Sequence, residues 1–71
     1  MTKEEAIQAM KEGKKVTHRF FTDDEFVRQP KPEIDEYEFE DGVVTSNILF
    51  WHFRKEEYWN DGWEIFNDLN Q

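Results

Sequence analysis

Carboxylates are the most numerous side chains here that could do chemistry, and three of them recur at every second position. Glu36, Glu38 and Glu40 alternate with aromatic residues in EIDEYEFEDG, residues 33 to 42. In a β-strand such side chains point to one face about 7 Å apart, which is too far for them to share one metal ion and similar to the repeat of phosphates along a nucleic-acid strand. The pattern predicts an acidic surface for a protein partner with a basic surface. Charges on an exposed strand also prevent aggregation, so an ordinary solvated face is the alternative.

A second acidic group follows the first predicted strand. Asp23 and Asp24 lie in TDDE, residues 22 to 25, whose capping-box spacing predicts a tight turn or a single helical turn. Carboxylates suit calcium and magnesium, but neither acidic segment has the spacing of an EF-hand loop. We therefore assign Asp23 and Asp24 to the surface that binds the partner, and we expect no metal site.

Groups suited to catalysis are scarce. The chain has no cysteine, one serine, Ser46, and two histidines, His18 and His52. No nucleophile elbow, zinc-protease or phosphate-loop motif occurs. Ser46 is placed to cap a helix, His18 alternates with apolar residues and is expected in the core or an interface, and His52 is expected to be exposed. The sequence predicts a protein that is not an enzyme and has no cofactor.

Aromatic residues must supply much of the hydrophobic core. They make up 17% of the chain, and many lie between residues 50 and 66. A domain of 71 residues cannot easily bury all of them, and tryptophan and tyrosine are favoured at protein interfaces. We expect two or three of these residues at an interface and a homodimer, with Trp51 and Trp59 as contacts to the partner; the interface candidates are Phe50, Trp51, Tyr58 and Trp59.

Length and composition limit the class of protein. Residues 1–71 are predicted to form one small domain. A formal net charge of −8 should repel nucleic acids and anionic membranes. No apolar run approaches a membrane span, no N-terminal signal pattern occurs, and the lack of cysteine indicates a reducing, cytoplasmic setting.

Local signals predict the elements that position these residues. A helix at about residues 3–12 begins with a capping box at Thr2 and Glu5 and ends at Gly13. Strands are expected at residues 14–21, from residue 26 until the loop at residues 30–32 stops it, and at 34–40, and a return strand follows a hairpin turn at residues 41–42. In the first of these strands Val16, His18 and Phe20 should share one face.

The second half of the chain is expected to add a short helix and a closing strand. The helix begins at Ser46, and a turn at residues 60–62 leads to a strand at 63–66, with a frayed tail at 67–71. The helix should pack through Ile48, Leu49, Trp51 and Phe53, with Phe50 as a further candidate. These apolar residues are too dense for one stripe, so some of them must be exposed or buried in an interface. The fold class is therefore α+β: an N-terminal helix on an antiparallel sheet of about four strands, with the second helix before the last strand.

Both ends of the chain resemble small phage and prophage proteins. EAIQAMKEGKKVTHRFF, residues 5–21, is similar to the E-A-L-x-x-L-K-x-G-K-x-V opening of Thoeris anti-defence and related anti-CRISPR proteins, and NDGWEIF, residues 60–66, to their closing D-W-x-I strand. The two segments cover roughly a third of the chain. The matching residues are Glu5, Ala6, Met10, Lys11, Gly13, Lys14, Val16, Gly62, Trp63 and Ile65. The resemblance implies an α+β fold and a phage-type anti-defence protein.

Two functions from different classes follow. The first is a small non-enzymatic protein that binds and inhibits a host protein, as an anti-CRISPR-like inhibitor does. The second is a binder of a small nucleotide-like ligand, with Arg19 or Arg54 holding an anionic group in an aromatic pocket. The chain has FFTDDEF where the resembling proteins have a W-N-G-K-G segment, and it lacks the longer middle that helps those proteins to hold a cyclic nucleotide-like ligand.

Overall fold

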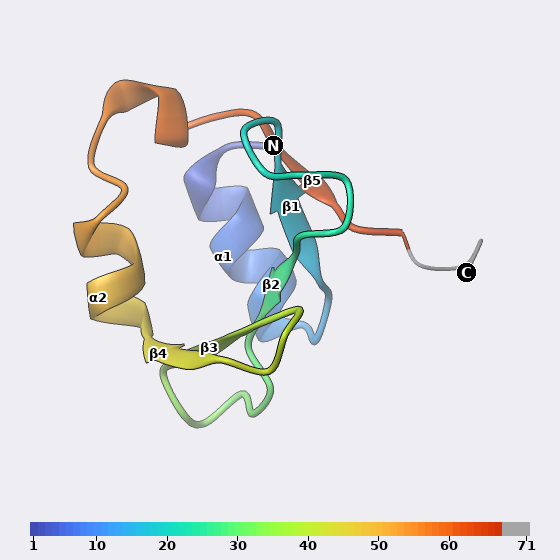
Figure 1. The fold of residues 1–71 in the computed structure, drawn as a ribbon. Helices are drawn as coiled ribbons and strands as arrows, with labels where there is room; N and C mark the ends of the chain where they lie inside the picture. Colours follow the sequence, from blue (N-terminus) through green and yellow to red (C-terminus); the bar gives the residue numbers. More distant parts are fainter. Residues whose placement is uncertain (68–71) are drawn as a thin grey trace.

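The computed structural model describes residues 1–67, in which an antiparallel sheet and two helices form two layers (Figure 1). The elements are α1 (Lys3–Lys11), β1 (Val16–His18), β2 (Val27–Arg28), β3 (Glu36–Phe39), β4 (Val44–Ser46), α2 (Asn47–His52), the 3-10 helix η1 (Glu57–Trp59) and β5 (Trp63–Ile65). The predicted α+β class and order of elements are confirmed, with five strands instead of about four. The predicted fraying of the tail concerns mainly residues 68–71, which lie outside the described part. Among residues 1–67, no helix has both the length and the apolar character that crossing a membrane requires.

The sheet has the strand order β4-β3-β2-β1-β5, and all neighbouring strands are antiparallel. Strands β1 to β4 lie side by side in chain order, whereas β5 returns from the far end of the chain to pair with β1. Val16 lies opposite Val27 on one side and opposite Ile65 on the other. The edges of the sheet are therefore β4 and β5.

Helix α1 begins and ends at the predicted signals. The backbone N–H of Thr2 donates to Oε1 of Glu5 at 2.8 Å, and the N–H of Glu5 donates to Oγ1 of Thr2 at 3.2 Å. This capping box pairs two backbone donors that would otherwise lack partners at the start of the helix. Gly13 has a φ of +85°, which stops the helix because other residues adopt this conformation only at a cost.

The hydrophobic core lies between one face of the sheet, the inner face, and both helices. Helix α1 contacts β1 and β5, and α2 contacts β3 and β4. Both helices supply buried side chains to a single cluster with the sheet, so they cover the same face. The buried apolar residues are Ala6, Ala9, Met10, Val16, Val27, Tyr37, Phe50 and Trp63.

Strand β1 is shorter than predicted, and the prediction that Phe20 continues its apolar face was wrong. The chain turns directly after His18, where the N–H of Phe21 donates to the carbonyl of His18 at 2.8 Å. Phe20 is 57% exposed. The alternation of apolar residues in the sequence continues past His18. Strand β5, however, begins at Trp63 opposite His18, so β1 has no partner strand on that side beyond His18.

The predicted packing of α2 was largely wrong. Phe50 is 1% exposed, whereas Ile48, Leu49 and Phe53 are 77%, 51% and 72% exposed. A helix of six residues makes less than two turns, so it turns only one narrow side toward the sheet. Phe50 and the half-buried Trp51 occupy that side. The helix start was predicted correctly, since Oγ of Ser46 accepts from the N–H of Leu49 at 3.1 Å.

The loop between β2 and β3 depends on Gln29, which sequence reasoning did not identify. Its side chain is buried, and its amide donates to the carbonyls of Lys31, Pro32 and Ile34 at 3.3, 3.3 and 3.0 Å. These bonds pair carbonyls of a loop that has two prolines and so lacks backbone donors. Gln29 therefore holds the loop that leads into the acidic strand.

Candidate functional site

In the described part of the chain neither helix covers the second face of the sheet, and the acidic residues of β3 lie there. Side chains that alternate with the core residues along each strand point to this side. We call it the open face and define it by Thr17, Arg28, Glu36, Glu38, Val44 and Glu64. These side chains are exposed or half-buried. The predicted division of this strand into an aromatic inner face and an acidic outer face is confirmed within β3.

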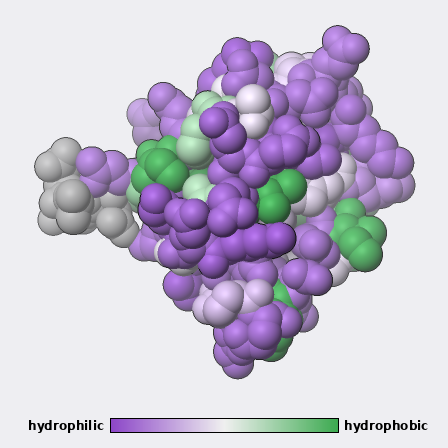
Figure 2. All heavy atoms as spheres, turned by 180° about the vertical axis from the view of Figure 1, so that it is seen from behind, coloured by the Kyte–Doolittle hydropathy of each residue, from purple (hydrophilic) through white to green (hydrophobic). Residues whose placement is uncertain are grey.

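The face of the molecule seen in Figure 2 is mainly hydrophilic, with apolar side chains in small separate areas. On the open face, however, the row of carboxylates is interrupted by a positive charge. Arg28, which lies opposite Glu38 in the sheet, donates from Nε to Oε1 of Glu38 at 2.8 Å. Such a partly exposed ion pair is worth about 0–1 kcal/mol, so it orients Glu38 more than it stabilises the fold.

Two acidic residues lie differently from the predicted row. Glu40, expected in the strand, lies beyond its end in the turn to β4, because the chain reverses at Gly42 with a φ of +87°. Glu64 on β5 adds a carboxylate to the open face that sequence reasoning missed. The sequence contains the signal for this position. Glu64 and Phe66 alternate with Trp63, so their side chains point away from the core.

An open hollow of about 400 Å³ lies at the end of β3. Its floor includes Phe26, whose ring lies 4.8 Å from that of Phe66, with Nζ of Lys15 4.7 Å from the ring centre of Phe26. The lining residues are Lys15, Phe26, Arg28, Glu38, Phe39, Glu40 and Gly42. The hollow therefore combines apolar contact area with charges of both signs, which suits a protein side chain better than a free anion.

The predicted aromatic contacts, Trp51 and Trp59, do not lie with the acidic residues. Trp51 is on the helix side, where Nε1 donates to the hydroxyl of Tyr37 at 3.1 Å. Burial raises the pKa of Tyr37, partly opposed by this bond, and the nearby charge of Asp35 raises it further. The thickness of the sheet separates Trp51 from Glu36 and Glu38. Phe50 is buried in the core, which removes it from the four interface candidates.

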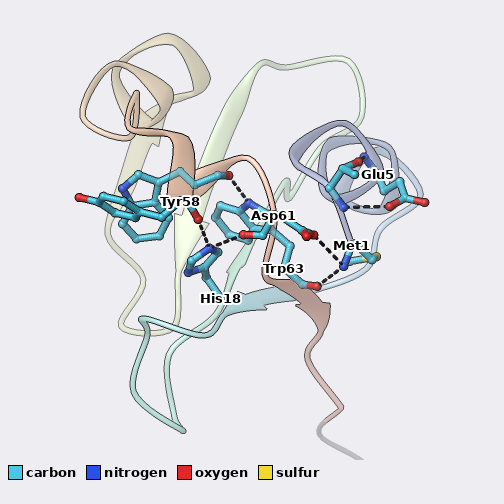
Figure 3. A network of polar contacts seen from close by, with 8 residues as sticks. Met1, Glu5, His18, Tyr58, Asp61 and Trp63 are labelled. Carbon is cyan, nitrogen blue, oxygen red and sulfur yellow. Dashed lines mark hydrogen bonds and ion pairs between the residues drawn. The ribbon is translucent and has the colours of Figure 1, made fainter.

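Trp59 packs on His18, which is a core residue with all its hydrogen-bonding groups paired (Figure 3). Nε2 of His18 lies 2.7 Å from the carbonyl oxygen of Asp61 and 3.1 Å from that of Tyr58, and Nδ1 accepts from the N–H of Phe20 at 3.1 Å. This set of partners requires the hydrogen on Nε2. His18 thereby fixes the turn before β5, as predicted for a core histidine, and His52 is exposed, also as predicted.

Asp23 and Asp24 are exposed in the turn between β1 and β2. The N–H of Thr22 donates to Oε1 of Glu25 at 2.8 Å, and the N–H of Glu25 donates to the carbonyl of Thr22 at 3.1 Å. The predicted turn is confirmed. In this turn both aspartates are charges that face solvent, and they are not part of the acidic row on β3.

Arg54, one candidate for holding an anionic group, is largely committed to the core. Its guanidinium carbon lies 4.0 Å from the ring centre of Phe50, and Nη1 donates to the carbonyl of Phe50 at 3.1 Å. Its Nε is buried without a hydrogen-bond partner in residues 1–67. Burial lowers the pKa of Arg54, and the charge of Glu25 opposes this effect. The other candidate, Arg19, is exposed beside Phe20.

A second open groove, of about 500 Å³, lies between the start of α1 and the outer side of α2. Nζ of Lys3 lies 4.8 Å from the ring centre of Trp51 within it. The lining residues are Lys3, Asn47, Ile48, Trp51, His52 and Lys55. In this strongly acidic chain, it is a local concentration of basic side chains.

Across residues 1–67, no three His, Cys, Asp or Glu side chains converge in a way that could hold a metal ion. Comparisons of the chain with protein-family models, with curated proteins and with solved structures found no match.

Proposed function

We propose that this protein is a small non-enzymatic binding protein that inhibits a host protein by covering a basic surface on it with the open face of the sheet. The observation that carries the proposal is the uncovered sheet face with Glu36, Glu38 and Glu64, on a chain with a net charge of −8. The resemblance of its ends to phage anti-defence proteins favours a defence protein as the target.

The mechanism we propose is steric, with electrostatic attraction. A net charge of this size speeds encounter with a basic partner and orients it. Glu38 is already held in place by Arg28, so it loses little side-chain freedom on binding. A lysine or arginine stem of the partner would fill the hollow beside Phe26 and bring its charge to Glu38 and Glu40.

The charge of the open face can be tested with a matched pair of triple variants. Glu36, Glu38 and Glu64 are changed to Gln in one variant, and Glu4, Glu56 and Glu57, which are exposed on α1 and beside or within η1, in the other. Both variants lower the net charge equally. We expect wild type and the second variant to capture the same basic protein from a nuclease-treated bacterial lysate, and the first variant to bind it at least about tenfold more weakly, with reduced salt dependence. Equal binding by the two variants would contradict the proposal.

The groove lined by Lys3 and Lys55 supports a second candidate function, which is the binding of a small anionic ligand. Lys3 and Lys55 could pair with a phosphate or carboxylate beside the indole of Trp51. If this is the function, a nucleotide or sugar phosphate in a thermal-shift panel raises the Tm of wild type in a saturable way, and the Lys3→Ala, Lys55→Ala double variant abolishes the shift. A flat panel would rule against this candidate and leave the first in place.

A further inference from the structure

The longest stretch of the chain without a charged side chain runs from Gly42 to Phe53. Charged residues make up 37% of the sequence, so twelve consecutive positions without Asp, Glu, Lys or Arg are unusual. This stretch forms β4 and α2. Besides His52, its exposed side chains are apolar, and they are Val43, Val44, Ile48, Leu49 and Phe53. We call these five residues the uncharged surface.

The uncharged surface is comparable in area to the largest apolar patches that small soluble proteins expose. Val43 and Val44 are 55% and 49% exposed, and Ile48 and Leu49 of α2 and Phe53 directly after it are exposed by half or more. Together they present on the order of 500 Å² of apolar surface, against the roughly 800 Å² per partner that a stable protein interface buries. They lie at one margin of the molecule, because α2 follows directly from the edge strand β4 (Figure 1).

The backbone of β4 is also available on its outer side. The N–H of Phe39 donates to the carbonyl of Val43, and the N–H of Asn47 donates to the carbonyl of Asp35. Because bonding residues alternate along an antiparallel pair, Val43, Thr45 and Asn47 face β3, and Val44 turns its N–H and carbonyl outward. Natural edge strands are often short or carry charge or proline to prevent pairing; β4 has three residues and carries neither charge nor proline.

The opposite edge of the sheet is protected in the ways that β4 is not. On β5, Met1 lies beside Trp63, whose N–H donates to the carbonyl of Met1 at 3.1 Å and whose carbonyl accepts from the terminal amine at 2.6 Å. Glu64 adds a charge in the middle of the strand. The contrast between the two edges indicates that β4 is left open for a partner rather than by default.

We propose that β4 and the outer side of α2 bind a second copy of this chain. Two copies that each carry −8 repel one another overall, so contact through a surface without acidic side chains costs the least electrostatic energy. A basic partner would instead gain most at the acidic surfaces, on the open face. An antiparallel strand pair has a two-fold axis between its strands, so β4 can pair with β4 of the second copy in a symmetric dimer. The two sheets then form one continuous sheet, with the two acidic β3 strands near the axis.

The dimer is tested by sedimentation of the full chain over a wide concentration range. We expect wild type to have twice the mass of the 8.7 kDa chain. Phe53→Asp or Ile48→Asp should weaken dimerisation by at least about a hundredfold, because burying a carboxylate in an apolar contact is costly. Both residues are exposed in the single chain, so the far-ultraviolet circular dichroism should stay unchanged. Phe20→Asp is the matched control: Phe20 is 57% exposed but lies outside the uncharged surface, and this variant should remain a dimer.

Salt separates this proposal from the proposed function. Screening of the repulsion between two acidic chains should strengthen the dimer as ionic strength rises, whereas binding of a basic partner should weaken. A wild-type chain that stays monomeric at every concentration and salt would overturn the dimer. Equal dissociation of the Phe20→Asp and Phe53→Asp dimers would also overturn the proposal. So would a monomeric wild type that captures a host protein, if the only effect of Phe53→Asp were to lose that protein. Loss of host binding in the open-face variant alone leaves the dimer intact.

Discussion

Replacing His18 with phenylalanine is expected to lower the free energy of unfolding by about 3 kcal/mol. The new ring can keep the contacts with Trp59 and Trp63, whose ring centres lie 4.4 and 4.7 Å from that of His18. It removes the hydrogen bonds of both ring nitrogens, so the carbonyls of Tyr58 and Asp61 lose a buried donor. Urea denaturation followed by tryptophan fluorescence measures the change.

His52→Phe provides the control for the same chemical change at an exposed site. We expect this variant to stay within about 0.5 kcal/mol of wild type, as surface substitutions usually do. If the two variants were equally stable, His18 would be a replaceable apolar residue and its hydrogen bonds would not determine the conformation of the turn before β5.

The Phe50→Ala substitution should have the largest effect of any single truncation in α2. Removing a buried phenylalanine costs about 3–5 kcal/mol, and a domain of this size has a total stability near the lower end of the usual 5–15 kcal/mol. Phe50 contacts Tyr37, Phe39, Trp51 and Trp63 as well as the guanidinium of Arg54. Its loss also leaves Arg54 without its closest aromatic contact. We expect most of the variant to be unfolded at 37 °C, as measured by thermal denaturation.

Phe53→Ala makes the same truncation three residues later, where the side chain is exposed. At low protein concentration this variant should melt within a few degrees of wild type, since no core contact is lost. If dimerisation occurs through α2, the difference between Phe53→Ala and wild type should grow with protein concentration, because a dimer raises the Tm by mass action. Comparable destabilisation by the two truncations at low concentration would mean that the helix packs differently.

Features set by near neighbours in the chain were predicted well. The capping box at Thr2, the helix start at Ser46 and the turn at Gly42 depend on hydrogen bonds or backbone conformations a few residues long. The alternation in β3 correctly separated Tyr37 from the glutamates. Such signals need no knowledge of what lies across the sheet.

Features that depend on strand partners were not predictable. The sequence shows no reason for Arg28 to lie opposite Glu38, because that register follows from where the loop held by Gln29 ends. The positions of Trp51 and Trp59 on the helix side likewise follow from the side of the sheet to which both helices return. The composition of α2 indicated only that some apolar residues must be exposed, and the narrow contact of a short helix decided which.

The pairing of β5 with β1 also sets an order in which the fold can form. Strands β1 to β4 pair with their neighbours in the chain, so their contacts close short loops. The pairing of Val16 with Ile65, in contrast, closes a loop that contains most of the chain. The same late strand carries Trp63, the largest fully buried side chain. The core is therefore complete only when β5 has paired with β1 and Trp63 has entered it, so one late pairing couples the two distant ends of the described chain.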